Sequence, residues 1–80
     1  MSYTKFNRHE NMSMATLSEI GDIIGEVRWD SSFDLSNMLF GLYDGYLYEE
    51  LLPLAEKELD SELYNRIYGV LVVISNYPKL

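Results

Sequence analysis

Four acidic side chains recur at helical spacing within residues 16–30, and they form the most distinctive chemical pattern in the sequence. This acidic row comprises Glu19, Asp22, Glu26 and Asp30. Side chains three or four residues apart share one face of a helix, and the only cation of the segment, Arg28, lies off that face. Each neighbouring pair of acids costs roughly 0.2–0.5 kcal/mol of repulsion. We expect no internal cation to neutralise these carboxylates, so the row predicts a face that binds lysine and arginine side chains of another protein. The alternative is a merely solvated face.

A second candidate contact surface combines tyrosines and acids between residues 43 and 50. Its members are Tyr43, Asp44, Tyr46, Tyr48, Glu49 and Glu50. Tyrosine is large, stiff and amphipathic, and such residues often give an interface its affinity. The alternative is that about half of the tyrosines only cover the edge of the core. Trp29 could anchor an interface, but in so small a domain we expect it in the core.

Residue types that carry out covalent or metal chemistry are scarce. The chain has no cysteine and one histidine, His9, which we expect to be a solvated residue without a second metal ligand at a suitable spacing. The five glycines form no phosphate-binding fingerprint, and the Glu-x-x-His motif of di-iron bundles is missing. Acid and base catalysis by two carboxylates would need one of them buried with a raised pKa, whereas these acids fall on faces expected to be solvated. We therefore expect no enzymatic activity, no bound metal and no cofactor.

The charge of the chain limits the partners that it can bind. Its 80 residues carry a formal net charge of −7, and residues 14–62 hold twelve acidic side chains against two basic ones. This excess argues against direct binding to nucleic acid or to an anionic membrane and favours a basic protein. The sequence shows neither a charged N-terminal region followed by an apolar run nor an apolar stretch of about 18 residues. We therefore expect no secretion signal, no membrane span and a cytoplasmic location.

Apolar residues at spacings of three and four predict four helical segments that would present these acids. The segments cover residues 16–30, 32–44, 46–58 and 60–75. Residues expected on their inward faces are Leu17, Ile20, Ile24, Val27, Leu35, Met38, Leu39, Leu42, Leu47, Leu51, Leu54, Ala55, Leu63, Ile67, Val70 and Ile74. Serine, threonine and aspartate favour helix starts, and the candidate caps are Ser13 or Thr16, Ser32 or Asp34, and Asp60 or Ser61.

Two of these segments allow alternatives. Pro53 lies inside the third segment, which is therefore either kinked or divided into two short helices joined at Leu52. Residues 70–75 are rich in valine and isoleucine and could form a strand, but helix is favoured because no partner strand is evident. Residues 1–13 lack periodicity and predict a loosely ordered arm, which Tyr3 and Phe6 could still pin to the body. The predicted fold is all-α, a three- to four-helix bundle in a single domain of residues 14–80 that follows this arm.

In size, charge and helical pattern the chain is similar to immunity proteins that neutralise basic nuclease toxins and to phage proteins that block restriction or CRISPR machinery. The similarity involves no matched motif, and it implies an inhibitor of a basic toxin or nucleic-acid-binding enzyme. The second possibility is a homo-oligomeric regulatory or structural subunit, such as a homodimer, with the apolar surface of residues 67–74 as interface, together with Gly21 and Gly25. Those two glycines otherwise leave room for another helix to approach. A carrier of a small ligand is the third possibility, although 80 residues can barely enclose a pocket.

Overall fold

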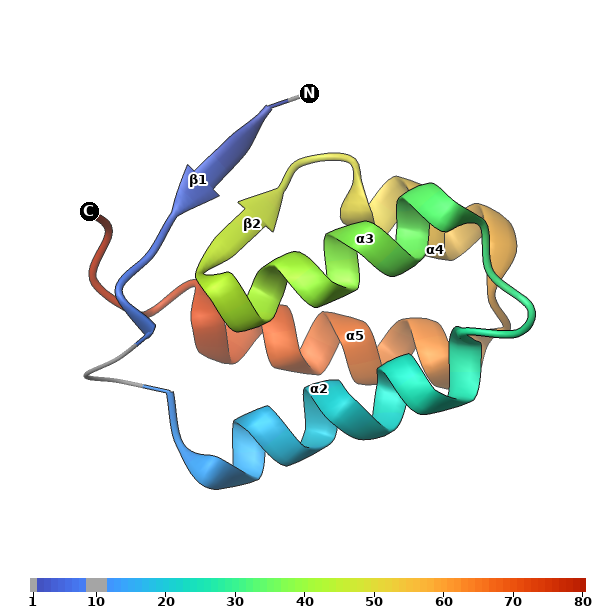
Figure 1. The fold of residues 1–80 in the computed structure, drawn as a ribbon, viewed down its shortest axis with the longest axis horizontal. Coiled ribbons are helices and arrows are strands. Elements are labelled where there is room, and N and C mark those ends of the chain that lie inside the picture. Colours follow the sequence, from blue (N-terminus) through green and yellow to red (C-terminus); the bar gives the residue numbers. More distant parts are fainter. Residues whose placement is uncertain (1, 9–11) are drawn as a thin grey trace.

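The computed structural model describes residues 2–8 and 12–80, which form four α-helices and a small antiparallel sheet (Figure 1). In chain order the elements are β1 (Tyr3–Lys5), α2 (Met14–Val27), α3 (Phe33–Gly41), the 3-10 turn η1 (Leu42–Asp44), β2 (Tyr46–Tyr48), α4 (Leu51–Glu58) and α5 (Ser61–Ile74). The expected helical character is confirmed, but the fold is not purely all-α. No helix in the described part of the chain is long and apolar enough to cross a membrane. Met1 and residues 9–11 of the expected arm, which include His9, lie outside the described residues.

Side-chain caps fix the starts of the three longest helices. In each cap a side-chain oxygen accepts from the backbone N–H three residues further on, and the pairs are Ser13 with Thr16 at 3.2 Å, Ser32 with Leu35 at 3.2 Å, and Asp60 with Leu63 at 2.9 Å. These bonds satisfy amides that have no partner within the helix. Each of the three capping residues is one of the two candidates that the sequence offered for its helix.

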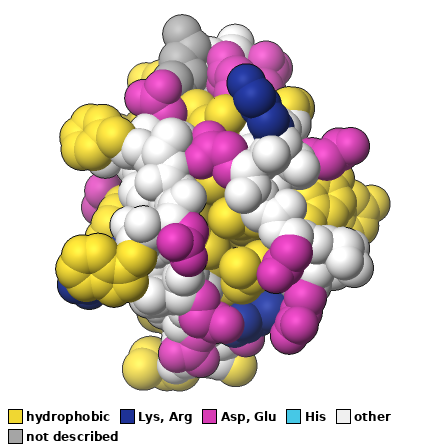
Figure 2. Space-filling view, turned by 90° about the vertical axis from the view of Figure 1, so that its right-hand side faces the viewer, with side chains coloured by type: hydrophobic (Ala, Val, Ile, Leu, Met, Phe, Trp, Pro, Cys, Tyr) yellow, Lys and Arg dark blue, Asp and Glu magenta, His cyan; other side chains and the backbone are white. Residues whose placement is uncertain are grey.

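The α2 helix ends earlier than the acid spacing predicted. It ends at Val27, and the N–H groups of Asp30 and Ser31 both donate to the carbonyl oxygen of Val27, at 3.0 and 2.8 Å. The chain must leave the helix here because Ser32 already caps α3. Asp30 therefore lies in the α2–α3 turn instead of continuing the helical row. This turn and the α4–α5 turn lie at the same end of the molecule, at the right in Figure 1, and that end faces the viewer in Figure 2.

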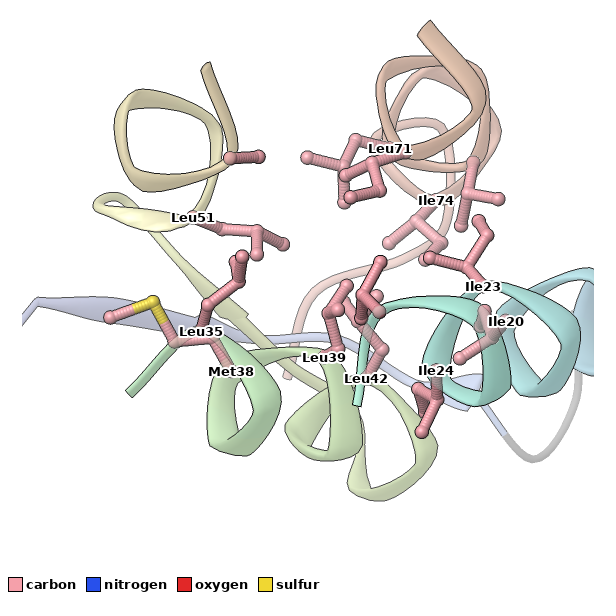
Figure 3. Packing of buried hydrophobic residues seen from close by; sticks show 14 of the residues in the cluster. Ile20, Ile23, Ile24, Leu35, Met38, Leu39, Leu42, Leu51, Leu71 and Ile74 are labelled. Carbon is pink, nitrogen blue, oxygen red and sulfur yellow. The ribbon is translucent and has the colours of Figure 1, made fainter. Parts of the chain in front are cut away.

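The core lies between the four helices, with apolar side chains of each pointing toward the others (Figure 3). Its buried residues are Phe6, Ile20, Ile23, Ile24, Val27, Leu35, Met38, Leu39, Leu42, Leu51, Ala55, Ile67, Val70, Leu71 and Ile74. Most of the residues expected on inward faces are confirmed by their burial. The exceptions, which are half-buried, are Leu17, Leu47, Leu54 and Leu63.

The prediction of a helix that starts at Tyr46 is wrong, because residues 46–48 form the strand β2. Gly45 has a φ of 85°, a left-handed conformation that favours glycine, and it turns the chain out of η1. β2 then pairs with β1 in an antiparallel register that sets Tyr3 opposite Tyr48 and Lys5 opposite Tyr46. The partner strand lies near the N-terminus, far from β2 in the sequence, so local periodicity gave no sign of it.

Residues of the expected arm supply this partner strand and also a core side chain. Phe6 is only 3% exposed, and its N–H donates to the carbonyl oxygen of Gly45 at 2.8 Å. The N–H of Asn7 donates to the carbonyl oxygen of Pro78 at 2.8 Å. Residues 3–7 are therefore held between the η1 turn and the C-terminal segment, which corrects the expectation of a loosely ordered arm for this part of it.

Both alternatives left open by the sequence are resolved. Pro53 is the third residue of α4, in the first turn, where a backbone N–H has no partner within the helix. The segment is therefore neither kinked at Pro53 nor divided at Leu52. Residues 70–74 belong to the helix α5, so the strand alternative is wrong for them.

Candidate functional site

The helical part of the acidic row lies along α2 beside α5. Glu19 is half-buried, whereas Asp22 and Glu26 are exposed, as is Asp30 in the turn that follows. The opposite face of α2 packs into the core through Ile20 and its neighbours. The structure thus places three carboxylates of the row on one solvent-facing stripe, as their spacing predicted.

Arg66 of α5 contacts two members of this row. Its Nε donates to Oε1 of Glu19 at 2.8 Å, and its Nη1 donates to Oε2 of Glu26. The hydrogen bond to Glu26, and then that to Glu19, raise the pKa of the Arg66 guanidinium. The prediction that no internal cation neutralises the row is therefore wrong. This cation reaches the row only because α5 packs against α2. The one sign of it in the sequence was that Arg66 lies beside Ile67 and Val70, which were expected to face inward.

Most carboxylates nevertheless face solvent without a cation. Of the twelve that the structure describes, ten are exposed, and only Glu19 and Glu58 are half-buried. Within residues 2–8 and 12–80, the only ion pairs are those that Arg66 forms with the acidic row. The negative charge is therefore spread over much of the surface instead of being confined to α2.

The tyrosine and acid cluster of residues 43–50 lies around the sheet. Tyr46 and Tyr48 are half-buried, and Tyr3 of β1 packs against both, with ring centroids at 5.0 and 5.5 Å. The Nζ atom of Lys5 lies 4.0 Å from the centroid of the Tyr46 ring, a cation–π contact. These rings are thus largely engaged within the molecule. The acids of the cluster, which are exposed, are Asp44, Glu49 and Glu50.

The two predicted contact groups do not merge into one face. β2 packs against α3 and η1, and the sheet lies at the end of the molecule opposite to the α2–α3 turn (Figure 1). Between them, Tyr43 of η1 is half-buried beside α2. A Cβ added at Gly21 would lie 2.7 Å from the hydroxyl oxygen of Tyr43, whereas one added at Gly25 would meet nothing within 4 Å. Gly21 therefore makes room for a tyrosine hydroxyl and not, as predicted, for a helix.

Two rings at the α2–α3 turn are the most exposed aromatic side chains in the described part of the chain. Trp29 and Phe33 are each 79% exposed, and the guanidinium of Arg28 lies 4.5 Å from the centroid of the Trp29 ring. The expectation that Trp29 belongs to the core is wrong, because α2 ends at Val27 and the turn directs the indole outward. Phe33 was not among the residues predicted to contact a partner. The available signal was its position directly after the Ser32 cap and off the buried stripe of α3.

Glu58, at the end of α4, fixes this turn to the other half of the bundle. Its Oε1 accepts from the backbone N–H of Ser32 at 2.6 Å, and its Oε2 accepts from the Ser32 hydroxyl at 2.6 Å. The hydroxyl bond, and then the backbone bond, lower the pKa of the Glu58 carboxyl. We call this pair of hydrogen bonds the Ser32–Glu58 clasp. It holds the segment that carries Trp29 and Phe33 against the end of α4.

Two shallow, largely apolar grooves flank α5. One, of about 330 Å³, lies between the sheet and α5, where Leu47, Tyr68 and Val72 are among its lining residues. The other, of about 470 Å³, lies between α2 and α5 beside Arg66. Among residues 2–8 and 12–80 no polar or charged side chain is buried, and no group of three or more His, Asp or Glu side chains could hold a metal ion. The features that stand out chemically are therefore on the surface: exposed carboxylates and exposed aromatic rings.

Comparisons with known protein families, with curated proteins and with solved structures find no match.

Proposed function

We propose that this chain is a cytoplasmic, non-enzymatic binding protein that inhibits a basic, nucleic-acid-handling enzyme or toxin, as immunity proteins and anti-restriction or anti-CRISPR inhibitors do. The observation that carries the proposal is the net charge of −7, with ten of the twelve described carboxylates exposed and ion pairs formed by Arg66 alone among the described cations. Such an excess destabilises the compact state through self-repulsion. Lysine and arginine side chains that normally contact phosphates would offset this repulsion, so the partner's nucleic-acid site is the complementary surface.

The exposed acids of the α2 side are the first proposed contacts. Within residues 2–8 and 12–80, Asp22 and Asp30 form no ion pair, whereas Glu19 and Glu26 share their charge with Arg66. The second group lies at the sheet and consists of Asp44, Tyr46, Tyr48, Glu49 and Glu50. Because the tyrosine rings are packed against Tyr3, the acids of this second group are its accessible part.

Affinity capture with nucleic-acid competition tests this proposal. The immobilised protein is incubated with extract of its native cell at low salt, and bound proteins are eluted by a salt gradient or by duplex DNA or RNA. We expect a basic protein that elutes at moderate ionic strength. At 0.1 M salt, the interaction between exposed charges more than about 10 Å apart is largely screened. We also expect nucleic acid to displace it. If no captured protein is displaced by nucleic acid, the proposal is wrong.

Paired charge reversals locate the contact. Asp22→Lys with Asp30→Lys, and Asp44→Lys with Glu49→Lys, change the net charge by the same amount on the two predicted groups. If only the net charge mattered, capture would be weakened equally in both double variants. We expect the first double variant to bind more weakly than the second, and neither substitution touches the contacts of Arg66.

A homo-oligomeric subunit remains the second candidate, because α5 keeps an apolar strip in solvent. Tyr68, Val72 and Val73 are 51%, 48% and 45% exposed. A second copy would cover this strip in a symmetric dimer. Light scattering distinguishes the two functions: an inhibitor of the proposed kind is a monomer, whereas a dimer that Val72→Lys dissociates would favour the oligomeric subunit.

A further inference from the structure

Trp29 and Phe33 project from the α2–α3 turn without any role in the core. Single exposed apolar side chains are common on protein surfaces. Two aromatic rings four residues apart, each 79% exposed, form a more unusual feature: Trp29 lies within the turn and Phe33 is the first residue of α3. Aromatic side chains dominate the energetics of interfaces because a single ring buries about 150–250 Å². Tryptophan in particular is enriched among the residues whose truncation costs most binding energy.

The turn is held in one conformation by hydrogen bonds that do not involve either ring. The carbonyl oxygen of Val27 accepts from two successive backbone N–H groups, at 3.0 and 2.8 Å. The hydroxyls of Ser31 and Ser36 are 2.8 Å apart. The Ser32–Glu58 clasp then ties the turn to the end of α4. A partner that buried these rings would therefore have little backbone entropy to remove, which favours binding through preorganisation.

Acidic side chains surround the two rings at this end of the molecule. Asp30 and Asp34 are exposed in the turn and in the first turn of α3. Across the clasp, the end of α4 and the start of α5 add further exposed acids, which are Glu56, Asp60 and Glu62. Figure 2 looks onto this end and shows acidic side chains distributed between projecting hydrophobic ones. The cations in these stretches are Arg28, which lies over the Trp29 ring, and Lys57.

We infer that this turn is the anchor of the inhibitor: Trp29 and Phe33 enter an apolar recess on the partner, and lysine and arginine side chains around that recess face the acidic rim. The acidic rim comprises Asp30, Asp34, Glu56, Asp60 and Glu62. This inference rests on the proposed function and adds the location of the contact. Charge complementarity decides the occupant, because phosphates of a nucleic acid or of an anionic membrane would be repelled by the rim. Asp30 belongs both to the rim and to the acidic row, so the anchor continues the α2 side of the surface.

Substitution of the rings tests the anchor in the same capture assay. We compare Trp29→Ser and Phe33→Ser with Phe40→Ser, which removes an exposed aromatic ring from α3 instead. Circular dichroism verifies that each variant is folded. We expect each ring variant to bind the nucleic-acid-displaced partner at least about 30-fold more weakly, the effect of losing a dominant interface residue, and Phe40→Ser to bind as the parent does. Undiminished capture by the Trp29→Ser, Phe33→Ser double variant overturns the anchor and leaves the proposed function intact.

A defined probe tests the anchor independently of any captured protein. The probe is a synthetic helical peptide with arginines on one face and leucines on the other, and the control peptide carries serines in place of the leucines. Trp29 is the only tryptophan of the chain, so its fluorescence reports on this turn alone. We expect the leucine peptide to shift the emission to shorter wavelength and to reduce acrylamide quenching, and the serine peptide to do neither. If the leucine peptide leaves both signals unchanged, the anchor is wrong, whatever the capture assay shows.

Discussion

Replacing Arg66 by glutamine should reveal how strongly the acidic row depends on this one cation. Arg66→Gln removes two ion pairs, whose side chains are 28% exposed for Arg66, 39% for Glu19 and 53% for Glu26. Each partly exposed pair contributes about 0.2–1 kcal/mol. The substitution also restores the full repulsion among neighbouring acids of α2, at roughly 0.2–0.5 kcal/mol per pair. We therefore expect a destabilisation of about 1–2 kcal/mol.

Thermal and urea unfolding measure this change. For a domain of this size, 1 kcal/mol lowers the Tm by about 4–8 °C, so we expect a decrease of about 4–16 °C. Arg66→Lys should recover only part of the loss, because an ammonium group cannot reproduce the two-pronged geometry of a guanidinium. Added salt should reduce the difference between variant and parent, since it screens both the ion pairs and the repulsion.

The matched control is Lys79→Gln, which changes the net charge equally but removes no ion pair among the described residues. Lys79 is exposed near the C-terminal end. If Arg66→Gln and Lys79→Gln unfold at the same temperature and urea concentration, net charge alone explains the effect. The reasoning about the contacts of Arg66 with α2 would then be refuted.

Three further stability predictions follow from single contacts. Phe6→Ala should cost about 3–5 kcal/mol in urea unfolding, because Phe6 is 3% exposed; a loss below 1 kcal/mol would show that the segment before α2 is dispensable. Gly25→Ala should raise the free energy of unfolding by about 1 kcal/mol, since its Cβ meets open space, whereas Gly21→Ala should gain less, since a tyrosine hydroxyl must move; equal gains would contradict this packing. Glu58→Gln should cost about 0.5–1 kcal/mol at pH 7 through the contact with Ser32. Because the pKa of Glu58 is lowered on folding, this stability is present above its unfolded pKa and is lost as the pH falls through the folded value, so parent and variant should converge in acid.

The sequence predicted those parts of the fold that depend on local periodicity and caps. The inward stripes of α2, α3 and α5 follow from apolar residues at spacings of three and four, and the caps Ser32 and Asp60 are each one of the two candidates for their helix. The same reasoning failed at Tyr46, because the alternation Tyr46-Leu47-Tyr48 is too short to distinguish a strand from the first turn of a helix. Pairing with Tyr3–Lys5 decides the outcome, and that contact joins distant parts of the chain.

The candidate site was predictable in its charge but not in its details. The spacing of Asp22 and Glu26 placed them correctly on a solvent-facing stripe of α2. The partner of Glu26 could not be deduced, because Arg66 reaches it only through the packing of two helices. Trp29 was placed in the core because size and hydrophobicity favour burial, yet the early end of α2 leaves it outside. Helix ends are set by caps and turns, and a shift of a few residues there reverses the direction of a side chain.

Arg66 has opposite effects on the stability of the fold and on the proposed binding. In the free protein it neutralises part of the charge of Glu19 and Glu26, which stabilises α2 but weakens the field toward a basic partner. Arg66→Gln should therefore bind that partner roughly two- to fivefold faster at low salt while it unfolds more easily. Lys79→Gln changes the net charge equally without releasing any of the described carboxylates, so it should accelerate association less. Equal association rates for the two variants would show that the partner responds to net charge and does not contact this part of the acidic row.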